Sequence, residues 1–89
     1  MELLFSGQFN RDIDGRSRKL SSEIRNAIFD VKKAKDSSQI QYLVKLKKYK
    51  VHYRIQVYND YRIGVIIRGN TVCFVRFGHR TIFYKKLFP

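Results

Sequence analysis

The feature that most constrains the fold is an alternation of apolar and polar residues in the second half of the chain. It runs over residues 51–57 and again over residues 61–67, with Asn59-Asp60 between them as a turn signal. A period of two is the signature of a strand that buries one face. Gly69-Asn70 is typical of a tight hairpin and leads into a third apolar run at residues 71–77. The pattern predicts a meander of three long antiparallel strands.

The register of this meander predicts two unlike faces. If residues 58–60 form the first loop, Ile55 faces Ile63, and the apolar rows of both strands share one side. A two-residue second turn would place Arg76 opposite Ile63 on that apolar side, so we expect a bulge, a register change or an exposed strand end near Arg76. The other side of the first two strands then carries Arg54, Gln56 and Arg62.

The first half of the chain favours two helices. Phe9, Ile13 and Leu20 follow one another with helical spacing, so we expect a first helix that contains Gly15, although glycine weakens a helix interior. The serines at residues 21–22 can cap a second helix. Its apolar face is formed by Ile24, Ala27, Ile28, Val31 and Ala34.

These elements predict a small α+β fold. Residues 2–6 suit an N-terminal edge strand, and the two helices are expected to pack on one face of an antiparallel sheet of three further strands. Residues 81–89 are expected to form a short tail. A chain of 89 residues has room for one hydrophobic core, so we expect a single domain over residues 1–89.

The charge is concentrated in the same half as the meander. The chain holds 19 Lys and Arg against 7 Asp and Glu, a formal charge of +12, and the single carboxylate among residues 45–89 is Asp60. Such a field attracts polyanions, above all RNA or DNA. No apolar stretch approaches the ~20 residues of a membrane span. The lone cysteine, Cys73, cannot close an internal disulfide, which favours a reducing, cytoplasmic setting.

The basic half suits one kind of chemistry better than others. One cysteine and two histidines do not make a structural zinc set, and two-metal phosphodiester chemistry needs a carboxylate cluster, so we expect no metal and no cofactor. Metal-free cleavage of RNA remains open, because the substrate supplies its own nucleophile, the 2′-hydroxyl beside the scissile phosphate. Arg62 and Arg80 are the candidates that would stabilise the charge of a pentavalent transition state. His79 and Tyr84 are the candidates for proton transfer, since histidine titrates near neutral pH and nearby cations favour a phenolate.

A simpler alternative is a basic surface that binds nucleic acid without cutting it. His52 is expected to be a strand-surface residue with no role, and Cys73 a small buried apolar residue. Tyr53 and Tyr61 lie in the apolar rows and are expected in the core rather than as platforms for bases. The residues expected to contact nucleic acid are Lys45, Lys47, Lys48, Lys50, Arg68, Arg76, Lys85 and Lys86.

Several short motifs follow one another along the chain. They are Phe9-Asn10-Arg11-Asp12, Asp60-Tyr61-Arg62-Ile63-Gly64, Gly69-Asn70-Thr71, Gly78-His79-Arg80, and the terminal Tyr84-Lys85-Lys86 with Phe88-Pro89. Taken together, they resemble the RelE/ParE superfamily of bacterial type II toxins, in particular its RelE branch. The resemblance spans nearly the whole chain, and the combination is specific although each piece alone is weak.

The resemblance implies a toxin that cleaves mRNA on the ribosome without metal and leaves a 2′,3′-cyclic phosphate. It implies that Arg62 stabilises the transition state and that Arg80 supports the phosphate and the leaving group. Tyr84 resembles the C-terminal tyrosine that orients or activates the nucleotide at the cut. Arg54 falls where the family often has a lysine or arginine, and His79 where many relatives carry a histidine.

The resemblance also implies partners and leaves a second activity open. ParE-type toxins share the scaffold and poison DNA gyrase without cutting RNA. A cognate antitoxin is expected, and the charge of this chain predicts that it is acidic and folds on binding to give a hetero-oligomer. The sequence departs from the family at Gln56, where one branch has a second lysine, and at Lys48, where glycine is common. The short C-terminus predicts a site that stays open until the antitoxin covers it.

Overall fold

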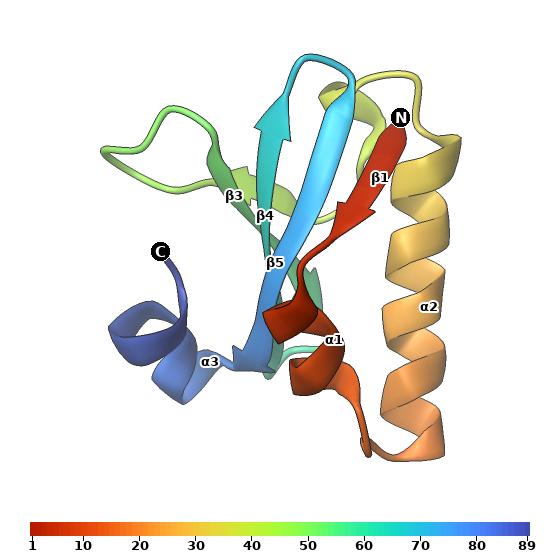
Figure 1. The fold of residues 1–89 in the computed structure, drawn as a ribbon, viewed down its shortest axis with the longest axis vertical. Coiled ribbons are helices and arrows are strands. Elements are labelled where there is room, and N and C mark those ends of the chain that lie inside the picture. Colours follow the sequence, from red (N-terminus) through yellow and green to blue (C-terminus); the bar gives the residue numbers. More distant parts are fainter.

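The computed structural model describes all 89 residues (Figure 1). The elements occur in the order β1 (Glu2–Phe5), α1 (Gly7–Ile13), α2 (Arg18–Lys33), η1 (Ser37–Gln39), β2 (Leu43–Lys45), β3 (His52–Val57), β4 (Tyr61–Arg68), β5 (Thr71–His79), α3 (Arg80–Ile82) and η2 (Phe83–Leu87). Here η1 is a short 3-10 helix and η2 a single π-helical turn. Residues 80–89 are called the C-terminal segment below.

The five strands form one mixed sheet in the order β1-β5-β4-β3-β2. β1 runs parallel to β5, and the remaining neighbours are antiparallel. The predicted meander is confirmed as β3, β4 and β5, and Ile55 lies opposite Ile63 as expected. β2 was not expected. It has only three residues, too few for a period of two to be visible in the sequence.

The irregularity expected near Arg76 is present as a shift of register. Gly64 lies opposite Arg76, but its neighbour Val65 lies opposite Phe74, so Val75 is an extra residue in β5. Because β5 has one extra residue there, the side chains that follow Val75 point to the opposite face from the one that strict alternation would give. Phe77 therefore takes the place opposite Ile63 on the apolar side, and Arg76 belongs to the other face.

The helix boundaries differ from the prediction. α1 ends at Ile13, and Gly15 lies in the connection to α2 with φ +73°, a left-handed conformation that glycine adopts without strain. The expectation of Gly15 inside the first helix was therefore wrong. Ser17, not a serine at 21–22, caps α2 by accepting a hydrogen bond from the Leu20 N–H at 3.2 Å. Leu20 accordingly belongs to α2.

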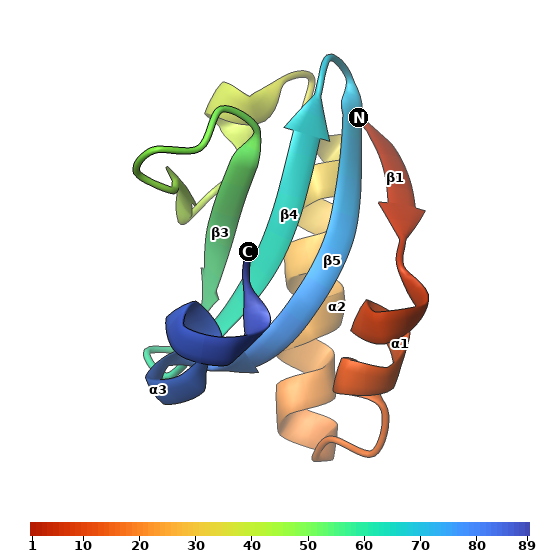
Figure 2. The same cartoon turned by 60° about the vertical axis from the view of Figure 1, so that its left-hand side comes forward.

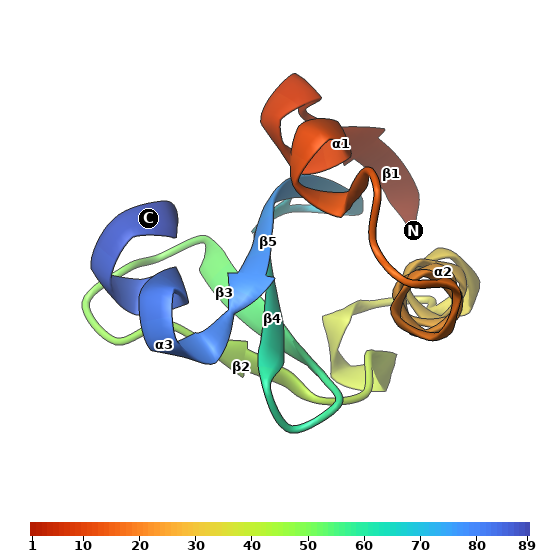
Figure 3. The ribbon, with the colours of Figure 1, turned by 90° about the horizontal axis from the view of Figure 1, so that it is seen from below.

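The main hydrophobic core lies between the helices and one face of the sheet. Figures 2 and 3 show α2 running along that face, with α1 packed beside it near β5. Phe9 of α1, Val31 of α2 and Phe74 of β5 are completely buried there. Tyr53 and Tyr61 are partly buried against this core, in line with their predicted place in the apolar rows. Both helices cover the same face, as predicted.

The opposite face of the sheet is partly covered by the C-terminal segment. This segment curls back over the ends of β4 and β5, on the side away from α2 (Figures 2 and 3). Phe83 and Phe88 are buried, at 0% and 2% exposed. A Cβ added to Gly64 would meet the Phe88 ring, and one added to Gly78 would meet Leu87, so the two strand glycines leave room for the segment. The short tail expected at residues 81–89 is thus a packed segment that covers part of this face, a role the sequence did not predict.

Candidate active site

The candidate catalytic residues gather at the end of the sheet where the β3–β4 turn meets the end of β5. Arg62 is the second residue of β4, and Arg80 follows directly after β5. The β4–β5 register places Arg62 opposite Gly78, two residues before Arg80. Residues 62 and 80 are therefore brought together by strand pairing across 18 positions of sequence.

Arg62 is held in place by the turn that precedes it. Its Nη1 donates to the carbonyl oxygens of Asn59 and Tyr61, each at 2.9 Å. Its Nε is buried and has no hydrogen-bond partner within the protein. A guanidinium whose Nη1 is fixed by two carbonyl oxygens keeps its charge in one place, which favours an anion such as phosphate at that end of the sheet.

Arg80 is bound to the same turn through Asp60. The Arg80 backbone N–H donates to the Asp60 carbonyl oxygen at 2.7 Å, and the Arg80 Nε lies 3.3 Å from Asp60 Oδ1. Both side chains are about half exposed, at 53% and 52%. An ion pair so exposed is weak, so a phosphate group can displace the carboxylate at little cost. The pairing of Asp60 with Arg80 was not predicted from the sequence. The fact that Asp60 is the single Asp or Glu among residues 45–89 could have indicated it.

Arg54 lies on the same face of the sheet as Arg62. The register places Arg54 opposite Gly64 and Gln56 opposite Arg62, so the two arginines are diagonal neighbours. Diagonal neighbours on a sheet are within reach of long side chains. Arg54 can therefore add positive charge to the surface beside Arg62.

His79 is the last residue of β5, directly before Arg80. It lies opposite Tyr61, and the two rings meet edge-on with centroids 5.3 Å apart, at the rim of the helix-covered face. Its Nδ1 lies 3.2 Å from the Thr81 N–H, which donates to it at the start of α3. The same nitrogen lies 3.0 Å from the Thr81 hydroxyl oxygen, which can accept a hydrogen bond from Nδ1 when that nitrogen carries a proton.

Tyr84 lies in the C-terminal segment, one helical turn after Arg80. It is about half exposed, and its ring meets Phe83 edge-on at 5.0 Å. Phe83 is buried and thereby anchors the turn that carries Tyr84. The structure thus brings Arg62, Arg80 and Tyr84 to one end of the molecule, through β4 and the C-terminal segment.

The residues predicted to contact nucleic acid are spread over several places. Lys45 ends β2, and Lys47, Lys48 and Lys50 lie in the loop from residue 46 to 51. Lys48 has φ +69°, a conformation that explains why glycine suits this position. Lys85 and Lys86 lie in η2 beside Tyr84, and Arg68 ends β4 at the opposite end of the sheet.

Arg76 is engaged in an internal ion pair with Asp12 of α1. Its Nε lies 2.8 Å from Asp12 Oδ2, and the Phe77 N–H donates to the same oxygen at 2.9 Å. Burial alone would raise the pKa of Asp12, but the hydrogen bonds from Arg76, Phe77 and Gln8 outweigh burial and hold that pKa below its ordinary value. Arg76 therefore ties α1 to β5, and its guanidinium is occupied in the free protein.

No cluster of three His, Cys, Asp or Glu side chains capable of holding a metal ion is present. No helix has the length and apolar character needed to cross a membrane. Cys73 is partly exposed on the sheet face opposite α2, rather than buried as predicted.

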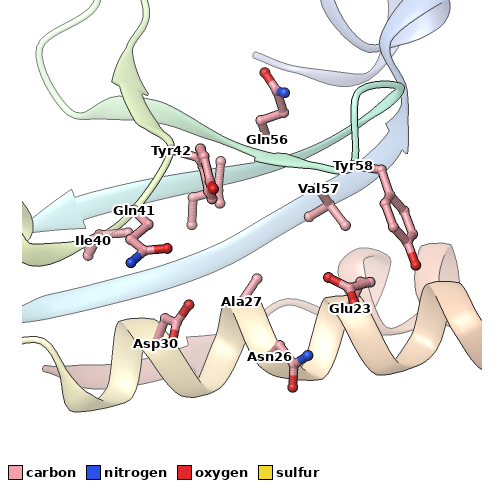
Figure 4. Close-up of a pocket in the computed structure, with 11 residues that line it drawn as sticks. Glu23, Asn26, Ala27, Asp30, Ile40, Gln41, Tyr42, Gln56, Val57 and Tyr58 are labelled. Atoms are coloured by element: carbon pink, nitrogen blue, oxygen red, sulfur yellow. The ribbon is translucent and has the colours of Figure 1, made fainter.

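A pocket lies away from the arginines, between α2 and β3 (Figure 4). It encloses about 380 Å³, its floor includes Ile55 and Val57, and Glu23 and Asp30 line its helix side. This pocket carries the opposite charge to the basic face and contains none of the predicted site residues. The candidate active site is an exposed surface, not a cavity.

Comparisons with known proteins point to one family. Toxin RelE3 from Methanocaldococcus jannaschii is 31% identical to this chain over 85 residues, which cover 94% of the chain and 96% of the relative. The structure of a RelB-RelE antitoxin-toxin complex from Methanococcus jannaschii matches with a TM-score of 0.78 and 29% identity, covering 97% of this chain and 99% of that one. YafQ from E. coli shares the fold, with a TM-score of 0.72 at 14% identity over 93% and 97% of the two chains. No family model matches the sequence.

Proposed function

This chain belongs to the RelE family of toxins, and on that premise we propose that it is the toxin of a type II toxin–antitoxin system that cleaves mRNA on the ribosome. The observation that supports this most strongly is the convergence of Arg62 and Arg80 on the Asn59–Tyr61 turn. Two cations at one end of a sheet, each held by the same turn, match the needs of a phosphate whose charge increases during reaction.

The proposed reaction needs no metal. The 2′-oxygen of the substrate attacks the adjacent phosphorus, and the bond from phosphorus to the 5′-oxygen breaks. The 2′-hydroxyl loses its proton and the departing 5′-oxygen gains one, so the products are a 2′,3′-cyclic phosphate and a 5′-hydroxyl. The protein aligns the in-line attack and stabilises the pentavalent phosphorane, which are positioning and electrostatic contributions.

Each candidate residue has a proposed role in this reaction. Arg62 and Arg80 bind the non-bridging phosphate oxygens, and Arg54 adds charge on the same face. Tyr84 is proposed to orient the nucleotide at the cut and, as the phenolate, to accept the proton of the 2′-hydroxyl. His79 is the proposed donor toward the leaving 5′-oxygen; this role needs the imidazolium form, which gives up its Nε2 proton and keeps the Nδ1 proton directed at the Thr81 hydroxyl oxygen.

The proposed protein partner is an acidic antitoxin. The RelB-RelE structure from Methanococcus jannaschii is an antitoxin–toxin complex, and the +12 charge of this chain favours an acidic segment as its counterpart. Such a segment would cover the arginines and prevent RNA from reaching them. Toxin and antitoxin are proposed to form a hetero-oligomer in the cytoplasm, where mRNA is translated.

The test is to express this protein from an inducible promoter and to map the 5′ ends of transcripts after induction. The matched control is the Arg62→Ala, Arg80→Ala double variant. The proposal predicts new ends confined to translated regions with the wild type, and none with the variant. Growth arrest with intact mRNA would contradict it and favour a gyrase poison of the ParE type instead. Absence of any arrest would favour a surface that only binds nucleic acid.

A further inference from the structure

A continuous row of aromatic rings crosses the sheet face opposite α2. Tyr49 lies 5.1 Å from His52, His52 lies 5.4 Å from Phe88, and Phe88 lies 5.6 Å from Phe83, measured between ring centroids. Tyr84 continues the row at 5.0 Å from Phe83. The row connects the loop between β2 and β3 with the C-terminal segment, two parts of the chain that are otherwise separate in sequence.

The interior and the ends of this row differ in exposure. Phe83 and Phe88 are buried, and the Nδ1 of His52 is buried without a hydrogen-bond partner. Tyr49 and Tyr84 are exposed at 42% and 49%. The buried rings fix the position of the two terminal tyrosines relative to each other, and each terminal ring keeps a surface that solvent or a ligand can reach.

The surroundings of Tyr49 are strongly cationic. The loop from residue 46 to 51 carries Lys47, Lys48 and Lys50 around it and contains no carboxylate. The loop is also fixed, because the Lys45 ammonium group donates to the Tyr49 carbonyl oxygen and the Tyr49 N–H donates to the Leu46 carbonyl oxygen. An exposed, positioned ring among lysines is the combination that binds single-stranded nucleic acid, with stacking on the base and charge along the backbone.

We propose that Tyr49 is a stacking platform for an unpaired base of the RNA, at a nucleotide that flanks the one held by Tyr84. The proposal rests on the proposed function for the identity of the ligand. Tyr84 and the two arginines hold the scissile phosphate, and Tyr49 binds the same strand further along the aromatic row. Its contribution is affinity and a preference for the base at that flanking position, not chemistry at the phosphorus.

Tyr58 offers a matched control on the other side of the molecule. It has the same exposure as Tyr49, 42%, but it borders the pocket between α2 and β3 (Figure 4). Glu23 lines that pocket, and the Lys19 ammonium nitrogen lies over the Tyr58 ring, 5.8 Å from its centroid, where a base would have to stack. Replacing Tyr58 with alanine therefore removes an equally exposed tyrosine from a surface that the proposal does not use.

The test measures binding without cleavage. The probe is a single-stranded RNA hexamer with 2-aminopurine at one position and 2′-O-methyl riboses throughout, which lack the nucleophile. Affinity is measured by fluorescence anisotropy, and stacking by quenching of the 2-aminopurine emission. Wild type, Tyr49→Ala, Tyr49→Phe and Tyr58→Ala are compared at fixed salt, after circular dichroism has verified that each variant is folded.

The proposal predicts quenching and saturable binding with the wild type. Tyr49→Ala should lose the quenching and bind about 5- to 150-fold more weakly, as expected for the loss of one stacked base. Tyr49→Phe keeps the ring and should retain both, and Tyr58→Ala should bind like the wild type. Wild-type behaviour of Tyr49→Ala, equal losses in the two alanine variants, or no binding by the wild type would each overturn the proposal. Because cleavage is not measured, failure of the proposed nuclease activity would show separately, in the transcript map.

Discussion

Replacing Gly64 with alanine tests how the C-terminal segment is held on the sheet. A Cβ at this position would lie 2.7 to 2.8 Å from three carbons of the Phe88 ring, which is closer than carbon atoms approach in proteins. Phe88 cannot simply move aside, because it is 2% exposed and packs against His52 and Phe83. Overpacking of this kind costs typically about 1–3 kcal/mol. We expect Gly64→Ala to lower the free energy of unfolding by that amount.

The same substitution should have the opposite sign when the Phe88 ring is absent. In a Phe88→Ala background the added methyl group meets open space, and alanine is favoured over glycine within a strand by roughly 0.5–1 kcal/mol. The four proteins of this double-mutant cycle can be compared by urea unfolding followed by circular dichroism. All four would carry Arg80→Ala, so that toxicity does not limit expression. Equal effects of Gly64→Ala in both backgrounds would refute the packing argument.

Three further substitutions test individual contacts. Asp12→Asn should lower the free energy of unfolding by about 1–3 kcal/mol at neutral pH. Because folding lowers the pKa of Asp12 below 3.8, the carboxylate stabilises the protein above pH 3.8, and this stabilisation is lost as the pH falls through the folded-state pKa. The free energy of unfolding of the variant should therefore depend less on pH in acid than that of the wild type, and the same pH dependence in both would argue against the ion pair with Arg76. Lys48→Gly should stabilise the chain by up to about 1 kcal/mol in urea unfolding, since it relieves a positive φ; a loss of stability would contradict this. Asp60→Asn frees Arg80 from its carboxylate and should tighten RNA binding at low salt, with a steeper dependence of the affinity on salt concentration; unchanged binding would show that Asp60 does not compete with phosphate.

The strands could be predicted because alternation directly encodes which face is buried. The regular register would have buried Arg76 opposite Ile63, so the sequence also predicted an irregularity there, and the structure shows that it is a shift of register. The first helix was harder to delimit. Ile13 and Leu20 share a helical spacing across Gly15, and only the cap at Ser17 shows that they belong to different helices.

The C-terminal segment could not be recognised as a covering element because it is too short to establish a period. Gly64 and Gly78 were the overlooked signal, since isolated glycines within strands often mark a place where another part of the chain approaches closely. Both lie beneath this segment.

The site was predicted in its residue types and less well in its geometry. The charge pattern identified Arg62 and Arg80, and the strand register brings them together. The pairing of Arg76 with Asp12 joins residues 64 positions apart, and no local pattern reveals it. Tyr49 was overlooked because its neighbours are lysines, and only its contact with His52 shows that its ring lies over the sheet.

The most direct test of the central claim is to remove the proposed nucleophile from the substrate. Purified protein would be added to ribosomes programmed with an mRNA that carries a single 2′-deoxynucleotide on the 5′ side of the mapped cut, and with the unmodified mRNA as control. The account predicts that the unmodified mRNA is cut to give a 2′,3′-cyclic phosphate, and that the single 2′-deoxy substitution abolishes the cut. Cleavage of the substituted mRNA at the same position and rate would contradict attack by the 2′-hydroxyl, and with it the roles assigned to Arg62, Arg80 and Tyr84.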